Sequence, residues 1–417
     1  MNQALRFGGN LILTRLLFPE AFGMMAIIQA VAFGAHMLTD VGVGPSIVQN
    51  ERGNNPVFLN TVWTVQIVRS VLVWVGLCAL GWPLAEFYGE PDFVRMFPVV
   101  GLAAIIVGFN STKLYTAQRN LEAVRVTQIE IGSYALGLFF TIFLAWLMQS
   151  VWALVWGGVF SAGLKMVASH IALHGIKNGF AWDRDTISHM RGFGRWILLS
   201  SSLTFLSIEG ARLLIGALLD MRQLALFTLA STLSMMFWQA MQQLAGSVFF
   251  PAYSEVNRTN PRNLKSVLFK ARLTLILPSW SLAVAFTFFG SQIMEILYDV
   301  RYHQSGIMLE QLAAGSLVAC VWGSYSGVLL ALAKVAPMTA LTAIQIVCQF
   351  AMMFIGYQYG GSAGLVMGVA AANWIVYPAY AFVMHQNGLW QPKLDLIVIA
   401  ASVLIVVLAW PSLNAVG

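Results

Sequence analysis

The sequence predicts an all-α polytopic membrane protein with about 12 to 13 transmembrane helices, in two pseudo-repeated six-helix lobes around a central cavity. Three observations lead to this prediction. Of the 417 residues, 59% are hydrophobic and only 10% are charged, whereas a soluble domain has about 25% charged residues. The apolar residues occur in long runs, and about 20 of them suffice to cross the hydrocarbon core of a bilayer. Finally, one pattern of apolar runs and breakers occurs twice along the chain.

Thirteen segments are expected to span the membrane, of which the first is short and the last has no counterpart in a repeat of six plus six. They are residues 3–18, 21–48, 58–85, 93–117, 121–148, 150–174, 193–219, 222–250, 264–290, 306–333, 335–358, 361–386 and 394–413. We therefore expect an N-terminal lobe at 1–176, a cytoplasmic linker at 177–192, a C-terminal lobe at 193–390 and an extra C-terminal span at 391–417.

The repeat is clearest at two breaks between apolar runs. The breaker Pro19-Glu20 corresponds to Met221-Arg222, and the apolar residues on both sides of it stay in step. A second echo, at a similar offset, pairs Phe87-Tyr88-Gly89 with Leu297-Tyr298-Asp299. A duplicated, mostly apolar chain is a common plan among transporters, whose substrate site lies between the repeats.

Lys and Arg are concentrated in the loops that follow even-numbered spans. Loops after odd-numbered spans contain only Arg15, Arg95, Arg222 and Arg301. Because basic loops stay in the cytoplasm, we expect the even-numbered loops and the N-terminus on that side. Basic residues dispersed in this way do not form a nucleic-acid surface, although the net charge is +6. The basic residues after even-numbered spans are Arg52, Lys113, Arg119, Arg125, Lys177, Arg184, Arg191, Arg195, Arg258, Arg262, Lys265, Lys270, Arg272, Lys334 and Lys393.

Charged residues inside the predicted spans are functional candidates, because each is costly to place in a membrane. Arg69, Lys165 and Arg212 could bind a diphosphate or an acidic sugar, since basic side chains bind phosphate oxygens strongly. We therefore predict these three as substrate-binding residues. The alternative is that Lys165 extends to the interface, as does Arg6, and that Arg212 forms a structural pair with Glu209, three residues earlier on the same helix.

Asp40, Glu130 and Glu209 are candidates for ion coupling, because intramembrane carboxylates often serve this role in pumps and transporters. The alternative for Asp40 is a polar residue at the broken cytoplasmic end of the second span, where Gly42 and Pro45 already explain the break. The same alternative of a structural polar residue applies to Glu130.

No catalytic residue, metal site or cofactor is predicted. His170 and His174 have an i,i+4 spacing that could hold a metal, but no carboxylate or thiol accompanies them. Cys78, Cys320 and Cys348 lie in apolar runs without pairing or metal spacing. H-E-x-x-H, P-loop and dinucleotide-binding patterns are missing from the sequence.

Small residues recur every four positions at Gly360, Gly364, Gly368 and Ala372. This spacing allows two helix backbones to approach closely. We predict a helix-packing face there and no ligand site.

Several stretches have a familiar pattern: LTRLLFPEAFGMMAIIQAVAFGAHMLTDVGVGPSIVQ, FYGEPD, ARLLIGALLDMRQLALFTLAS, and FFPAYSEV before a basic loop. They resemble bacterial polysaccharide transporters, the lipid-linked oligosaccharide flippase family of the multidrug/oligosaccharidyl-lipid/polysaccharide exporter superfamily. The resemblance covers nearly the whole chain, and its most specific part is the opening stretch. It departs at the first helix, which is usually fuller in that family.

The resemblance implies two six-helix lobes around a cavity, alternating access, and a bacterial inner membrane location with the N-terminus in the cytoplasm. The implied substrate is an undecaprenyl-diphosphate-linked oligosaccharide repeat unit, moved for exopolysaccharide, capsule or O-antigen (lipopolysaccharide) synthesis. The implied partners are this lipid-linked substrate, the lipid bilayer, and a polysaccharide polymerase with export machinery. The resemblance implies a cationic cavity for the anionic cargo. Arg69, Lys165 and Arg212 are the candidates for it in this sequence, on their charge alone and without a family motif that matches them residue by residue.

Other functions stay open at this point. A drug/cation antiporter, or a transporter of another lipid-linked precursor, would belong to the same superfamily, and an antiporter would depend on deep carboxylates such as Asp40 and Glu130. A membrane polymerase or ligase typically needs a large periplasmic loop, and every predicted outside loop is short. A structural scaffold has no need of charges inside the membrane. We therefore expect a transporter and not an enzyme.

Overall fold

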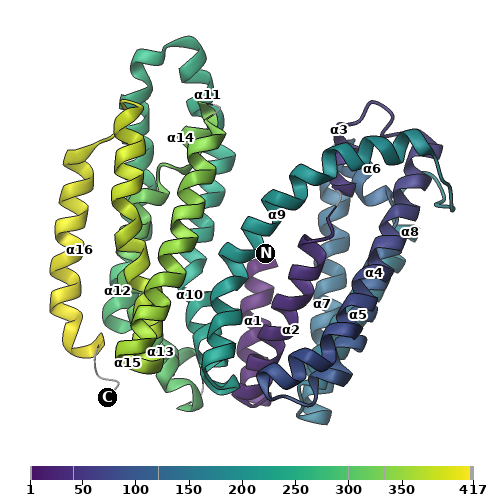
Figure 1. Ribbon diagram of the computed structural model, residues 1–417, viewed down its shortest axis with the longest axis horizontal. Coiled ribbons are helices and arrows are strands. Elements are labelled where there is room, and N and C mark those ends of the chain that lie inside the picture. The colour runs from purple at the N-terminus through teal and green to yellow at the C-terminus, as the bar shows by residue number, and fades with distance from the viewer. Residues whose placement is uncertain (1, 41, 121, 299, 333, 414–417) are drawn as a thin grey trace. The chain divides into compact units, whose positions relative to one another are not determined.

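The computed structural model consists of helices and the loops that connect them in the part it describes, residues 2–40, 42–120, 122–298, 300–332 and 334–413 (Figure 1). The chain forms two compact units, unit 1 (Met1–Met221) and unit 2 (Arg222–Gly417). The helices up to the end of unit 1 are α1 (Asn2–Leu16), α2 (Pro19–Met37), α3 (Val43–Gln49), α4 (Pro56–Tyr88), α5 (Phe93–Gly108), α6 (Lys113–Arg119), α7 (Ala123–Met148), α8 (Trp152–Ile171) and α9 (Arg184–Leu218). The later elements are α10 (Met221–Leu244), a π-helical segment (Ala245–Phe249), α11 (Phe250–Thr259), α12 (Leu264–Leu297), α13 (His303–Gly323), α14 (Ser326–Ala331), α15 (Val335–Gln386) and α16 (Pro392–Leu413), with 3₁₀ turns at Pro261–Asn263 and Val300–Tyr302.

Within the described residues, nine helices are long and apolar enough to cross a membrane, and ten if the bent pair α5–α6 counts as one span. The sequence predicts more spans for three reasons. The first is that α1 has only 15 residues. Secondly, α9 carries charged residues along its length and is not among the nine helices. Lastly, α15 contains two predicted spans that meet at Gly360 and Gly361, where φ and ψ leave the helical region.

Local sequence signals set the ends of α4. Asn55 precedes the helix, and its side chain accepts hydrogen bonds from the amides of Val57 and Phe58 at 2.9 and 3.3 Å, which satisfies two of the amides that a helix start leaves free. Gly89 ends the helix with φ of +70°, a conformation that glycine adopts without steric cost. The chain can then reverse into α5, and α4 and α5 pack as an antiparallel hairpin.

The α5–α6 pair is broken, with a bend of 53° between the two helices. The break exposes backbone carbonyl groups that a membrane interior cannot satisfy. Gln66 of α4 fills this role, because its Nε2 donates to the carbonyl oxygens of Gly108 and Asn110 at 2.8 and 3.3 Å. The side chain of Gln66 is buried, so the hairpin partner closes the break from inside unit 1.

The small-residue stripe lies where the two parts of α15 fold back on each other in unit 2. A Cβ atom on Gly364 would lie 2.1 Å from the carbonyl oxygen of Gly356, and one on Gly368 would lie 2.2 Å from that of Met352. Only glycine fits such backbone contacts, so the predicted packing face is confirmed at these two positions. Gly360 instead lies at the break and has open space around it.

Helix boundaries follow the sequence repeat. α2 begins at Pro19 and α10 begins at Met221, while α4 and α12 end at Tyr88 and Leu297. The helix α9, which the sequence assigns to the second lobe, packs on α2 and α4 of unit 1. The two compact units follow from contacts in space, whereas the predicted lobes follow from the sequence repeat. The lobe boundaries and the linker at 177–192 therefore stay predictions.

Candidate functional site

Arg69 joins the middle of α4 to the end of α2. Its Nη1 lies 3.4 Å from Asp40 Oδ1, its Nε donates to Thr39 Oγ1 at 3.2 Å, and its Nη2 donates to the His36 carbonyl oxygen at 2.9 Å. The ring nitrogen Nδ1 of His36 lies 3.0 Å from the same Nη2. The structure therefore brings a predicted substrate-binding cation together with a predicted ion-coupling carboxylate.

Asp40 lies between α2 and α3, at the break that the sequence predicts. Its Oδ1 also accepts a hydrogen bond from the Gly42 amide at 3.0 Å, and Gly42 has φ of +72° at the start of α3. Asp40 thus stabilises the turn and neutralises Arg69 with the same carboxylate. The contacts of Asp40 therefore fit both interpretations, a polar residue at the helix break and a carboxylate available for ion coupling.

Lys165 of α8 pairs with Glu130 of α7. The Nζ–Oε1 distance is 2.9 Å, and the two side chains keep 33% and 43% of their exposure. Lys165 therefore has a carboxylate partner on the neighbouring helix, and a second predicted binding residue meets a second predicted coupling residue. A half-exposed pair of this kind contributes little to stability, which leaves both groups available for other partners.

Arg212 and Glu209 form the predicted pair within α9. Arg212 Nη1 donates to both carboxylate oxygens of Glu209 at 3.0 and 2.9 Å, so this pairing is confirmed. Each of the three predicted cations has one of the three predicted carboxylates as its partner, and all six residues lie in unit 1. Pairing lowers the cost of placing these charges in a membrane.

The other charged candidates have local partners. The Arg6 guanidinium carbon lies 5.5 Å from the ring centroid of Tyr134, a cation–π geometry. His170 Nε2 contacts the Phe109 carbonyl oxygen at 2.9 Å, and His174 Nδ1 lies 3.1 Å from Arg125 Nη1. In the described parts of the chain, no group of three His, Cys, Asp or Glu side chains is placed to hold a metal ion.

The sequence also contains a G-x-S-x-G pattern at residues 360–364. In serine hydrolases this pattern forms a sharp turn from a strand into a helix. Here it joins the two helical parts of α15. The context of a nucleophile elbow is therefore missing, and the match is accidental.

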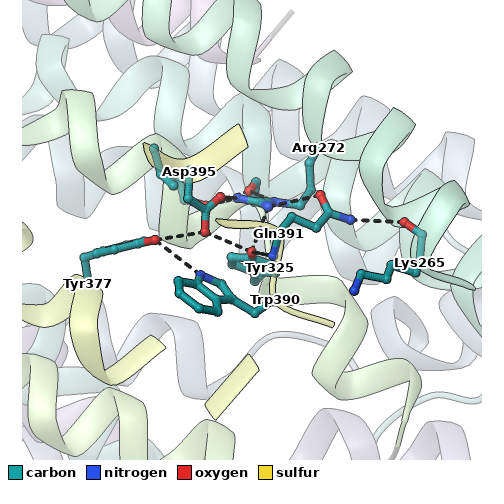
Figure 2. Close-up of polar contacts among 9 residues, drawn as sticks. Lys265, Arg272, Tyr325, Tyr377, Trp390, Gln391 and Asp395 are labelled. Atoms are coloured by element: carbon teal, nitrogen blue, oxygen red, sulfur yellow. Dashed lines mark hydrogen bonds and ion pairs between the residues drawn. The ribbon is translucent and has the colours of Figure 1, made fainter. Parts of the chain in front are cut away.

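Sequence reasoning missed a buried ion pair in unit 2, Arg272–Asp395 (Figure 2). Both side chains have no exposed surface, and Arg272 Nη2 lies 2.5 Å from Asp395 Oδ1. The other carboxylate oxygen accepts from the hydroxyl groups of Tyr325 and Tyr377, each at 3.0 Å. Arg272 further donates to Tyr325 Oη at 2.7 Å and to Gln391 Oε1 at 3.2 Å. The pair thus joins α12, α15 and α16 through a network in which both carboxylate oxygens are bonded.

The sequence does contain a signal for this pair. Arg272 lies eight residues inside the predicted span 264–290, yet the orientation argument counts it as a loop residue. That assignment is wrong, because Arg272 is fully buried within α12. Lys113 is likewise buried at the start of α6, where its Nζ donates to the His170 carbonyl oxygen at 2.8 Å. A formal loop count cannot separate such buried cations from solvated ones.

The first part of the predicted linker is hydrogen-bonded to side chains near the start of α4. Backbone amides of Gly179, Ala181 and Asp183 donate to the side chains of Asn60, Thr64 and Thr61 at 3.1 to 3.2 Å. The Asp183 carboxylate then caps α9, and hydrogen bonds from the side chain and amide of Thr186 lower the pKa of Asp183.

A cavity of about 350 Å³ lies in unit 2 among α13, α15 and α16. Its lining is apolar apart from Gln311 and includes Trp374 and Trp410. The Gln311 amide and the Trp374 indole both donate to backbone carbonyl oxygens, of Leu413 and Ala314. The cavity therefore offers no charged group for an anionic headgroup.

Comparisons with known proteins agree with this helical, charge-bearing membrane fold. The profile of a family described as polysaccharide biosynthesis protein matches residues 12–307. The chain is similar to the lipopolysaccharide biosynthesis protein WzxC of Escherichia coli (strain K12), with 16% identity over 358 residues that cover 86% of this chain and 72% of WzxC. It is also similar to the succinoglycan biosynthesis transport protein ExoT of Rhizobium meliloti (strain 1021), with 19% identity over 289 residues, 67% of this chain and 58% of ExoT.

Two solved structures share the fold. An inward-facing multidrug resistance MATE family transporter of the MOP superfamily matches with a TM-score of 0.71 and 16% identity, over 93% of this chain and 95% of that one. The lipid II flippase MurJ, in an inward closed conformation, matches with a TM-score of 0.73 and 11% identity, over 97% of this chain and 89% of MurJ. The predicted fold class and family resemblance are confirmed. ExoT, the MATE transporter and the flippase MurJ are transport proteins, which favours the predicted transporter over an enzyme. The chain is a multi-pass membrane protein, and it belongs to the polysaccharide biosynthesis protein family.

Proposed function

We propose that this protein flips an undecaprenyl-diphosphate-linked oligosaccharide repeat unit across the bacterial inner membrane by alternating access. The product would feed exopolysaccharide, capsule or O-antigen synthesis. A charged headgroup cannot cross about 30 Å of hydrocarbon unaided, because burying its polar groups without partners is too costly. A transporter of this cargo needs cations in its membrane helices that the cargo can reach.

The observation that carries the proposal is the set of paired cations in unit 1. Arg69, Lys165 and Arg212 retain 11%, 33% and 26% of their side-chain exposure, so each is held by a carboxylate but not enclosed. Such a pair is neutral when the transporter is empty. An incoming diphosphate can take the cation over, since basic side chains bind phosphate strongly.

Partner exchange would also link transport to an ion. When a cation moves to the cargo, its carboxylate on Asp40, Glu130 or Glu209 is left unpaired in a low-dielectric setting. An unpaired intramembrane carboxylate is costly unless it takes up a proton or a metal cation. The predicted coupling residues would then act only when their partners bind the cargo.

The test uses cells that lack this gene and asks which leaflet holds the lipid-linked repeat unit. We expect repeat units to accumulate on the cytoplasmic side, with rescue by the wild-type gene but not by Arg69→Ala or Arg212→Ala. Arg125→Ala is the matched control, because Arg125 pairs with Glu122 at the exposed start of α7 and should rescue fully. Unpolymerised units on the periplasmic side would contradict flipping and favour a polymerase.

A cation-coupled drug transporter of the same superfamily is the second candidate, favoured by the Asp40 carboxylate beside a helix break. In that case Asp40→Asn and Glu130→Gln should each abolish drug resistance while surface polymer stays normal.

The cytoplasmic N-terminus and the link to a polymerase and export machinery are further parts of our proposal. Labelling of single cysteines from either side of the membrane, and co-purification with the polymerase, test them separately.

A further inference from the structure

We propose that His36 is the proton-sensitive partner of Arg69, and that proton uptake at its Nδ1 atom releases the Arg69 guanidinium to an anionic cargo. This inference deepens the proposed function and rests on it, because it assumes that Arg69 contacts the cargo. It assigns a role to a residue that carries none in the sequence-based prediction.

The hydrogen-bond geometry defines the protonation state of His36 in the empty transporter. Arg69 has only N–H donors and stays charged, so at 3.0 Å from Nη2 the His36 Nδ1 atom accepts. The ring is then neutral and carries its proton on Nε2. A second proton on Nδ1 would replace the acceptor by a donor and place an imidazolium against the guanidinium. Two like charges at this distance repel, so the contact opens.

Proton uptake also solves the charge balance of the site. Asp40 lies 3.4 Å from Arg69 Nη1 and would lose its counter-ion when Arg69 moves to a phosphate. A protonated His36 supplies a new positive charge near the same carboxylate, because Asp40 follows His36 by four residues, just after the end of α2, and acts on it electrostatically. One proton enters, one cation is released to the cargo, and no carboxylate is left unpaired.

The surroundings of His36 support this role. Among the described residues, the charged groups that act on it are Arg69 of α4 and Asp40 after α2. One further titratable group, Tyr115 of α6, interacts electrostatically with both Arg69 and Asp40. The α9 side chain that faces Gly34 of α2 is the apolar Phe205. His36 keeps part of its surface exposed, although its ring is partly desolvated where it lies near Arg69 and Asp40. Histidine is the side chain whose charge changes near physiological pH.

The experiment measures binding of farnesyl diphosphate, a short prenyl diphosphate, to the purified full-length protein in detergent. Affinity is compared at about pH 8 and about pH 5, well above and well below the usual histidine pKa of about 6.5. For the wild type we expect about tenfold tighter binding at the lower pH, the factor that corresponds to ~1.4 kcal/mol. In His36→Asn the amide oxygen keeps an acceptor but cannot take up the proton. This variant should stay at the weaker affinity at both pH values, and its comparison with the wild type cancels the titration of the probe itself.

Controls separate the inference from the proposed function. His303→Asn removes another exposed histidine, paired with Glu295 in unit 2, and should keep the wild-type pH dependence. Arg69→Gln should weaken binding at both pH values. If Arg69→Gln binds as the wild type does, the role of Arg69 in cargo binding is wrong. If Arg69→Gln loses binding but His36→Asn keeps the full pH dependence, or the wild type has none, the role of His36 is overturned while the site stands. Should His36→Asn not fold, His36→Gln provides the same test.

Discussion

The two units handle charge inside the membrane in opposite ways. In unit 1 three ion pairs keep part of their side-chain surface exposed, from 10% at Glu209 to 43% at Glu130. In unit 2 the side chains of the Arg272–Asp395 pair have no exposed surface, and both carboxylate oxygens accept hydrogen bonds. The half-exposed Lys165–Glu130 pair is worth about 0–1 kcal/mol and can exchange partners, whereas breaking a fully buried pair costs about 3–5 kcal/mol. The comparison assigns partner exchange to unit 1 and stabilisation to the pair of unit 2.

The same contrast holds at one matching structural feature, the break in the second helix of a hairpin. In unit 1 the neutral Gln66 of α4 donates to the carbonyl groups at the α5–α6 break. In unit 2 Arg272 of α12 donates to Ser324 Oγ at 2.8 Å and to the Val321 carbonyl oxygen at 3.3 Å, at the α13–α14 break. A buried guanidinium needs a counter-charge, and Asp395 of α16 provides it. The last helix, which the sequence predicts to be an extra span outside the repeat, therefore supplies the counter-charge to Arg272. Unit 1 needs no counter-charge at its break, because Gln66 is neutral.

The two breaks also differ in how completely they are bonded. Gln66 Oε1 and Asn110 Oδ1 are buried without a hydrogen-bond partner among the residues described for unit 1. Around Arg272 the carboxylate, both tyrosine hydroxyls and the Gln391 side chain are all bonded. We therefore expect the α5–α6 break to bend more easily than the α13–α14 break.

The largest expected effect comes from removing the counter-charge in unit 2. Asp395→Ala leaves Arg272 buried without a carboxylate, and we expect it to lower the free energy of unfolding by about 3–5 kcal/mol. The measurement is thermal and denaturant unfolding of the purified protein in detergent. Lys393→Ala is the control, since Lys393 is exposed two residues earlier, and it should change stability by less than about 0.5 kcal/mol.

A double-mutant cycle sharpens this prediction. Arg272→Gln installs the side-chain type that unit 1 uses at its own break. Combined with Asp395→Asn it removes both charges, so the double variant should be more stable than Asp395→Asn alone, with a coupling energy of up to about 3 kcal/mol. If the double variant loses as much stability as the two single variants together, the pair is not coupled and the comparison with Gln66 fails.

A medium effect is expected where each unit packs neighbouring membrane helices through glycine. In unit 2 a Cβ atom on Gly364 would meet the Gly356 backbone, whereas in unit 1 one on Gly157 would meet the Thr141 side chain at 1.8 Å. Backbone cannot move aside as a side chain can. Gly364→Ala should therefore cost about 1–3 kcal/mol of unfolding free energy, more than Gly157→Ala. Gly360→Ala is the control, because its Cβ would point into open space, and a cost equal to that of Gly364→Ala would contradict the packing argument.

The smallest effect on stability is expected at an exposed pair of unit 1. Glu130→Gln should lower the free energy of unfolding by no more than about 1 kcal/mol, because the Lys165–Glu130 pair is half-exposed. The same variant should alter delivery of surface polymer, because it releases Lys165 from its partner. Polymer output from cells, normalised to the amount of protein in the membrane, checks this. A large loss of stability with unchanged polymer output would reverse the assignment of roles to the two units.

Prediction from the sequence worked best for features that depend on neighbours along the chain. The apolar runs predict the helices, Pro19 and Gly89 mark helix boundaries, and Glu209 with Arg212 are three residues apart on one helix, so their pairing follows from helix geometry. It also held for α15, because the two spans predicted at 335–358 and 361–386 meet at Gly360 and Gly361, where the backbone leaves the helical region. It failed for Arg272, because a basic residue near the end of a span looks the same whether it is solvated or buried.

The sequence by itself determined the all-helical membrane class, the family, and which charged residues lie within the predicted spans. Composition, hydrophobic length and local spacing are properties of contiguous residues, so they can be read without a fold. Only the tertiary structure decided which charges meet, because Arg69 and Asp40 are 29 residues apart and Arg272 and Asp395 are 123 apart. It also decided which pairs keep contact with the surface. Coulombic attraction and burial depend on distance in space, and helix packing alone brought these side chains together.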